Sequence, residues 1–258
     1  MTLPRRLLLL ALPVTLLVLW QAWGLTLPPK SAAPVPSQVV AAAYELIASG
    51  QLISGLRQSL ARVLTGFSVA GSLALILGLL MGYLRTVERN LDPIVETFRP
   101  VAPIALLPLA ILWLGTGTPA AVFVVAWAAF FPMIVNTTAG VKRVDRRLVD
   151  AARTMGLSQL QILRTVILPA TLPAIMVGAR LAMGAAWGSI IAAELAVGAK
   201  AGDAGTTGGI GEMMFIFYAY SVTLDGIVVC MLTVGLVALL IDQGLRLVQR
   251  RLMPWAVV

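Results

Sequence analysis

Long apolar stretches with almost no charge recur along the sequence. The stretch from Val63 to Leu84 contains no charged side chain, and similar stretches predict spans at about 119–135, 172–197 and 222–245. A helix that crosses the hydrocarbon core of a bilayer needs about 20 such residues. Because 59% of the residues are hydrophobic and only 12% are charged, the chain cannot cover its apolar surface in water. The sequence predicts an all-α, polytopic membrane protein and excludes a soluble enzyme.

Two further apolar stretches are less regular. Leu7–Leu27 follows two arginines and has the form of a signal peptide, but its length and its two tryptophans favour an uncleaved first span. The stretch 100–114 holds three prolines, so it can span only if its broken backbone is covered by protein or faces a cavity. The sequence therefore predicts about six transmembrane helices, with residues 1–36 as the first helix and a proline-rich linker.

The positively charged residues fit this arrangement of spans. Six spans place both termini on one side, and 14 of the 19 Lys and Arg residues then lie on that side, against four on the other. Because cytoplasmic loops carry such an excess, both termini are predicted to be cytoplasmic (N-in, C-in). The bias accounts for the whole net charge of +8, so a nucleic-acid partner is not needed to explain it.

The residue types that most membrane enzymes use are missing. The sequence contains no His and a single Cys, Cys230, which excludes His/Cys metal clusters, a Cys–His or Ser–His nucleophile pair and an intrachain disulfide. We therefore predict neither an enzyme nor a metal site. A secondary transporter or a channel for a small solute remains an alternative, although such proteins usually show internal repeats or several ionisable groups within their spans.

The segment 145–169, predicted to be cytoplasmic, contains strong helix start and stop signals. Asp145 is a suitable N-cap residue, and Gly156 suits the position after a helix C-terminus, where a positive φ angle is common. Ser158 and Gln161 match a capping box, and Pro169 ends the second helix or begins the next. The pattern predicts a short, exposed helix–turn–helix between the fourth and fifth spans.

Seven residues of this segment form a spaced pattern: Asp150, Ala151, Ala152, Gly156, Val166, Leu168 and Pro169. The pattern resembles the EAA motif of binding-protein-dependent ABC importer permeases, E-A-A-x3-G-x9-I-x-L-P, with Asp and Val replacing Glu and Ile. The stretches 99–115 and 130–137 are similar to the nitrate/sulfonate/taurine/bicarbonate branch of these permeases. The resemblance implies a type I ABC importer permease fold with a cytoplasmic coupling helix, formed by residues 37–258.

The resemblance also implies partners. Two permease copies, taken as a homodimer, would form the pathway in the bacterial plasma (inner) membrane, with two ABC ATPase subunits docked on the EAA helices. A periplasmic or lipid-anchored solute-binding protein would deliver a small anion such as nitrate, sulfonate, taurine or bicarbonate. The sequence itself lacks a G-x-x-x-x-G-K-[ST] loop. We therefore expect ATP and Mg²⁺ on the partner ATPase and no cofactor on this chain.

Five residues in the predicted spans or directly after one are candidates for the translocation pathway. Glu194 either faces a water-filled path, as intramembrane carboxylates often do, or lies near the outer interface, where water or backbone satisfies it. Arg180 either contacts solute or extends its charge to the inner interface. Asn136, Thr137 and Trp187 either line the pathway or pack between helices.

Three further features leave two interpretations each. Gly184 and Gly188 form a G-x-x-x-G pattern, which favours close helix approach, across a dimer or by chance. The glycine-rich stretch 198–211 is either a contact for the binding protein or a connector. Asp150 either touches the ATPase or pairs with an arginine of its own helix.

Overall fold

The computed structural model describes residues 3–26, 34–198, 208–220 and 224–253, and every regular element in these ranges is helical. This confirms the predicted all-α fold class. The helices are α1 (Leu3–Thr26), α2 (Pro36–Ala48), α3 (Gln51–Tyr83), α4 (Arg85–Phe98), η1 (Pro103–Leu106), α5 (Leu107–Leu114), α6 (Thr118–Lys142), α7 (Arg146–Thr154), α8 (Gln159–Ile162), η2 (Leu163–Ile167), α9 (Leu168–Gly198), α10 (Ile210–Tyr220) and α11 (Asp225–Leu252).

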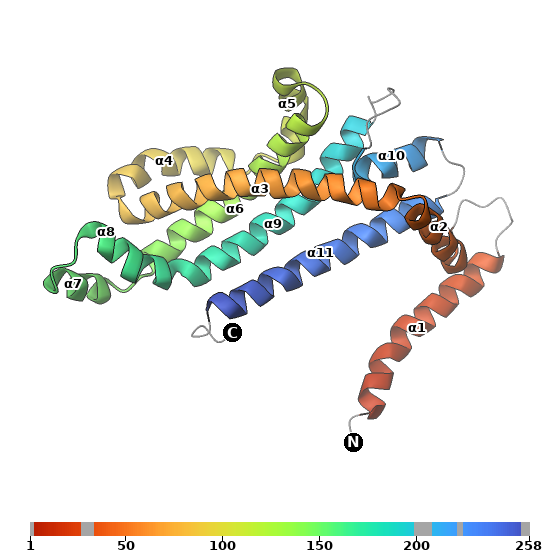
Figure 1. Ribbon diagram of the computed structural model, residues 1–258, viewed down its shortest axis with the longest axis horizontal. Helices are drawn as coiled ribbons and strands as arrows, with labels where there is room; N and C mark the ends of the chain where they lie inside the picture. Colours follow the sequence, from red (N-terminus) through yellow and green to blue (C-terminus); the bar gives the residue numbers. More distant parts are fainter. Residues whose placement is uncertain (1–2, 27–33, 199–207, 221–223, 254–258) are drawn as a thin grey trace.

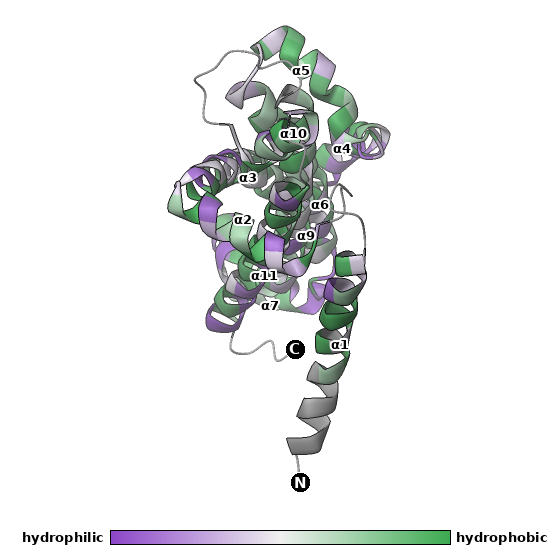
Figure 2. Ribbon diagram, turned by 90° about the vertical axis from the view of Figure 1, so that its right-hand side faces the viewer, coloured by the Kyte–Doolittle hydropathy of each residue, from purple (hydrophilic) through white to green (hydrophobic). Residues whose placement is uncertain are grey.

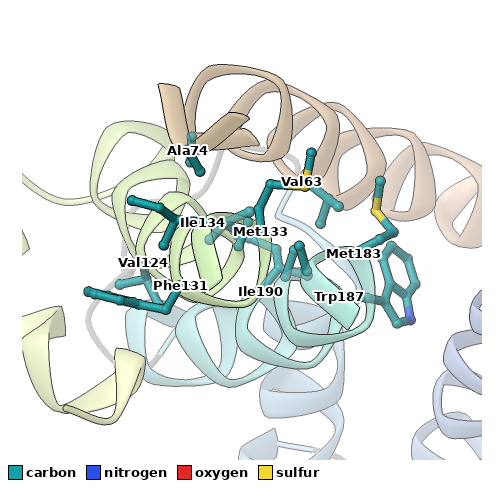
Figure 3. Close-up of a cluster of buried hydrophobic side chains, with 14 of the residues drawn as sticks. Val63, Ala74, Val124, Phe131, Met133, Ile134, Met183, Trp187 and Ile190 are labelled. Carbon is teal, nitrogen blue, oxygen red and sulfur yellow. The ribbon is translucent and has the colours of Figure 1, made fainter. Parts of the chain in front are cut away.

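Three long helices, α3, α6 and α9, form the centre of the bundle (Figure 1). Their apolar side chains meet in one buried cluster (Figure 3), in which Val63 of α3, Ile134 of α6 and Ile190 of α9 are at most 1% exposed. The predicted second span, 63–84, is only part of its helix. The helix begins at Gln51 and continues into this span without a break.

Glycines set the distance between these helices. A Cβ atom on Gly66 of α3 would lie 2.7 Å from Val125 Cγ1 and 2.9 Å from the carbonyl oxygen of Val122, both in α6. A Cβ atom on Gly178 of α9 would lie 2.8 Å from Asn136 Cβ. Membrane helices associate largely through such close packing, because lipid is as apolar as their side chains. The three central helices are therefore held together by close van der Waals packing rather than by the hydrophobic effect.

The surface of the bundle is apolar where a bilayer would cover it. α11 exposes Leu232, Leu236 and Leu239 to between 59% and 61%, and Figure 2 shows hydrophobic residues along α5 and along the coloured part of α1. Among the described residues, four helices are long and apolar enough to cross a membrane, or five if the bent pair of α4 and α5 counts as one span. α1 forms a helix over the predicted first span, and its retention in the membrane stays a prediction.

The stretch predicted to be a broken span is bent. α4 lies alongside α3, and the chain then turns by 89° into η1 and α5 (Figure 1). Trp127 of α6 supports this break by donating a 3.3 Å hydrogen bond to the carbonyl of Val101 and by packing edge-on against Phe98, with ring centroids 6.0 Å apart. The prediction that 100–114 departs from a straight helix is confirmed, since its prolines interrupt the helical hydrogen bonds.

The two ends of the bundle carry different elements. α7 and α8 lie together at one end, whereas α2 and α10 lie at the other (Figure 1). In the predicted topology the end with α7 and α8 is cytoplasmic, and the end with α10 faces outward.

Candidate functional site

The segment 145–169 forms the predicted helix–turn–helix. Asp145 caps α7 by accepting a 2.9 Å hydrogen bond from the backbone N–H of Arg147, and Gly156 ends the helix with a φ angle of +78°. Ser158 caps α8, and the side chain of Gln161 completes the capping box through a 2.8 Å bond from the Ser158 N–H. The predicted start and stop residues of this segment are confirmed.

A groove of about 510 Å³ runs between α7 and the start of α9. Its apolar rim is open, since Leu148 is 54% and Met155 is 78% exposed. Asp150 pairs with Arg153 at 3.7 Å while both side chains remain more than half exposed, so this weak pair leaves the carboxylate accessible. Four of the seven motif residues line the groove: Ala151, Ala152, Val166 and Pro169.

The groove is joined rigidly to the central bundle. Ala152 is only 6% exposed and packs in a cluster with Val141 of α6, Ile162 of α8 and Ile167 of η2. The chain then runs from α8 through the π-helix η2 into α9 without a turn. Pro169 is the second residue of α9, and its missing N–H accounts for the irregular helix just before it. A displacement of α7 and α8 would therefore be passed directly to α9.

At the other end, Glu194 of α9 is buried and fully hydrogen-bonded. Its side chain is 1% exposed. It forms a 2.9 Å ion pair with Arg62 of α3, accepts a 2.7 Å hydrogen bond from the Ser59 hydroxyl and accepts a 3.0 Å bond from the backbone N–H of Gly211. We call Ser59, Arg62, Glu194 and residues 208–211 the outer clamp, because they tie α3, α9 and α10 together.

The outer clamp also caps α10. Ile210 and Gly211 are the first two residues of this helix, and their N–H groups have no partner within it. The Ile210 N–H donates to Ser59 Oγ at 2.9 Å, and the Gly211 N–H donates to Glu194. A carboxylate at this position also complements the partial positive charge of a helix N-terminus. The cap of α10 is therefore supplied by two other helices.

Gly209 leaves room for the Glu194 carboxylate because it has no side chain. A Cβ atom on Gly209 would lie 2.0 Å from Glu194 Oε1, which no side chain can approach without moving the clamp. We expect Gly209→Ala to destabilise the protein by about 1–3 kcal/mol, the range for overpacking, measured as a fall in Tm. In a Glu194→Ala background the obstructing atoms are gone, so the added cost of Gly209→Ala should vanish. Additive effects of the two changes would contradict this steric account.

Glu212 of α10 lies close to the outer clamp, in a helix too short to cross a membrane. Burial raises the pKa of its carboxyl group above the usual range. The Arg62 guanidinium opposes this rise, and the negative charge of Glu194 adds to it. The outer clamp thus holds the Glu194 carboxylate in an ion pair, whereas burial disfavours ionisation of Glu212.

The other pathway candidates are dispersed through the bundle. Asn136 lines a cavity beside α4, and its side chain donates a 2.8 Å hydrogen bond to the Pro132 carbonyl. Thr137 is fully buried, and its hydroxyl has no hydrogen-bond partner among the described residues. Trp187 is 4% exposed and donates a 3.1 Å bond to the carbonyl of Val234 in α11. The structure thus places Asn136 at a cavity and the other two between helices.

Arg180 pairs across the bundle with Asp242 of α11 at 2.8 Å. Asp242 also pairs with Arg246 at 2.8 Å. Neither interpretation of Arg180 from the sequence anticipated this bridge between α9 and α11, because the two residues lie 62 positions apart.

Sequence reasoning also missed Ser59, Arg62 and the caps of α10. The pairing of Arg62 with Glu194 was not predicted, although an isolated acid within a span calls for a cation from a neighbouring helix. Ser59 and Arg62 share one helix face by their spacing of three, which was the available signal. Residues 199–207 of the glycine-rich stretch lie outside the described residues.

Comparisons with known proteins place the chain in a family. Residues 74–254 match the family described as binding-protein-dependent transport system inner membrane component. The putative aliphatic sulfonates transport permease SsuC of Escherichia coli is 39% identical over 249 residues, covering 95% of this chain and 90% of SsuC. The taurine transport system permease TauC of the same organism is 36% identical over 249 residues, covering 95% of this chain and 86% of TauC.

A solved structure confirms the predicted fold type. The inward-facing MetNI methionine ABC transporter contains a chain that matches 80% of this one and 97% of its own length, with a TM-score of 0.68 and 20% sequence identity. The type I importer permease fold is thus shown by structure, and the predicted resemblance to the nitrate/sulfonate/taurine branch is confirmed by sequence. The chain belongs to the family of binding-protein-dependent transport system inner membrane components, as a multi-pass, non-enzymatic permease subunit of an ABC importer of the sulfonate/taurine/nitrate type.

Proposed function

We propose that two copies of this chain form the pathway of an ATP-driven importer for a small anion such as a sulfonate, taurine, nitrate or bicarbonate. Two ATPase subunits dock on the segment 145–169, and a periplasmic or lipid-anchored binding protein delivers the anion. Support for the anion comes from the names of two relatives, which refer to aliphatic sulfonates and taurine.

The groove beside α7 is the observation that carries the coupling role. It is open, apolar and lined by small side chains, including Ala151 and Ala152, so that another protein can approach the helix backbone closely. Its floor is joined through the buried Ala152 to α6, to α8 and to η2, which leads into α9. The partner ATPase binds ATP and Mg²⁺, and its conformational change is transmitted to this chain at the groove.

The remaining motif and pathway residues have distinct proposed roles. Gly156 sets the turn, Asp150 offers an accessible carboxylate, and Val166, Leu168 and Pro169 lead into α9. Among the pathway candidates we propose that Asn136 faces the solute. Arg180, Trp187 and Glu194 hold α9 in register with its neighbours through the contacts described above. Thr137 of α6 packs against Gly78 of α3.

Substitutions at Gly156 test the coupling role. A Cβ atom there meets no other atom within 4 Å, so the φ angle of +78° is the main constraint. Gly156→Glu combines a strained backbone, costing about 1–2 kcal/mol, with a bulky charge at the docking surface. We expect it to abolish ATP-dependent uptake and co-purification of the ATPase, with membrane levels of the chain unchanged.

Gly156→Asn is the matched control, since Asn tolerates a positive φ angle, and it should retain most uptake. Coupled uptake that persists in Gly156→Glu would overturn the docking assignment, and uptake by the chain without any ATPase would indicate a secondary transporter. The solute is tested separately, by thermal-shift titration of the binding protein with taurine, ethanesulfonate, nitrate and bicarbonate.

A further inference from the structure

A cavity of about 480 Å³ opens beside the break between α4 and η1. Its walls come from the break itself, from α6 and from α9, and include Trp127, Phe131 and Asn136. Arg99 is the only charged side chain among the described residues that line it. The cavity thus combines the positive charge of Arg99 with a largely apolar and aromatic wall.

The cavity lies at the middle depth of the bundle. Its α6 residues fall between Trp127 and Asn136 in a helix that runs from Thr118 to Lys142. Its α9 residues, Leu181 and Ala185, occupy the middle of Leu168–Gly198. Arg99, which the sequence groups with the cytoplasmic charges, lines this cavity from the end of α4, where the break begins.

An arginine at this depth calls for a ligand or a counter-ion. Among the described residues, Arg99 forms an ion pair only with Glu96 of α4, at 3.5 Å, and the two side chains are 54% and 62% exposed. Such a long, open pair contributes little and leaves the guanidinium free to exchange partners. The last turn of α4 adds the partial negative charge of a helix C-terminus, which stabilises the cation without occupying its donors.

We propose that Arg99 and the surrounding cavity form an anion-binding station halfway along the translocation pathway. This inference rests on the proposed function and extends it by assigning the residue that holds the solute. A guanidinium presents a planar set of donors that matches two oxygens of a sulfonate, nitrate or bicarbonate group. Asn136 uses one amide N–H on Pro132 and retains a second for the anion. Broken helices at mid-depth are a recurring way to expose such groups to a solute.

The test uses the complete complex of chain, ATPase and binding protein in liposomes. Uptake of labelled taurine, ethanesulfonate and nitrate is measured, and the best transported anion is carried forward. We expect Arg99→Gln to lower its uptake by about tenfold or more, the loss typical of a charge-assisted hydrogen bond, and Arg99→Lys to recover part of it. ATPase stimulation by the loaded binding protein should persist in both variants, since the coupling groove is untouched.

Glu96→Gln is the matched control, because it breaks the ion pair but keeps the cation. It should leave uptake unchanged. Wild-type uptake in Arg99→Gln would contradict the proposed anion-binding role of Arg99. An equal loss of uptake in Glu96→Gln would also contradict it, because the ion pair between Arg99 and Glu96 would then have only a structural role. A wild-type complex that transports none of the three anions would instead contradict the proposed solute class, and loss of ATPase co-purification in Arg99→Gln would show that Arg99 serves assembly.

Discussion

Replacing Glu194 by alanine is expected to lower the stability of the purified protein by about 3–5 kcal/mol, the cost of removing one partner from a buried ion pair. The change leaves the Arg62 guanidinium, 12% exposed in its side chain, without its counter-charge. It also removes the acceptor for the Gly211 N–H and part of the cap of α10. The loss should appear as a fall in Tm in detergent and as faster proteolysis near α10.

Asp242→Ala is the control for this experiment. It removes a carboxylate that also bridges two helices, but the Arg180 and Asp242 side chains are 31% and 38% exposed, so solvent screens the pair. The expected fall in Tm is clearly smaller. The Tm of Glu194→Gln should lie between those of the two alanine variants, since its amide oxygen still accepts hydrogen bonds. Equal Tm values for Glu194→Ala and Asp242→Ala would show that burial of the clamp contributes nothing.

The second large effect is expected at Gly66. Any side chain there must displace α6, because its Cβ atom would lie 2.9 Å from a backbone oxygen, which cannot rotate away. Gly66→Ala should cost about 1–3 kcal/mol, and Gly66→Leu more, measured by Tm and by the yield of monodisperse protein. Separation of α3 from α6 would also disturb the shared buried cluster around Val63 and Ile134.

Gly71 offers a matched comparison on the same helix. Its Cβ position is 4.0 Å from the nearest atom, the ring of Phe67, which is an ordinary contact. Gly71→Ala should therefore be neutral, or stabilising by up to about 1 kcal/mol through helix propensity. If both alanine variants behaved alike, close approach at Gly66 would not be what sets the helix spacing.

Local features were the ones that the sequence predicted well. Asp145, Gly156 and Ser158 determine helix ends through contacts within a few residues, so their pattern can be read directly and the structure agrees. The prolines of 100–114 likewise predicted a broken span, because their effect on the backbone is intrinsic. The length of the apolar stretches and the uneven distribution of Lys and Arg were sufficient to predict a helical, multi-pass membrane protein.

Long-range features were not accessible in the same way. Ser59 and Glu194 lie 135 positions apart, and neither helix carries a periodic signal that identifies its partner. The depth of Arg99 depends on the direction in which the chain turns at the break, which the prolines do not specify. Both cases required the packed positions of three helices, and both involve the charged residues whose environment is least evident from a hydropathy pattern.

The cap that α3 and α9 provide for α10 has a consequence for how this protein can change through evolution. The start of α10 is held by Ser59 of α3 and Glu194 of α9, so the helix keeps its cap only while both side chains are present. Loss of either side chain leaves an N–H group of α10 without its acceptor, which favours a compensating change on the other helix. Positions 59, 194 and the glycines beside them are therefore expected to change together in evolution, although they are far apart in the sequence.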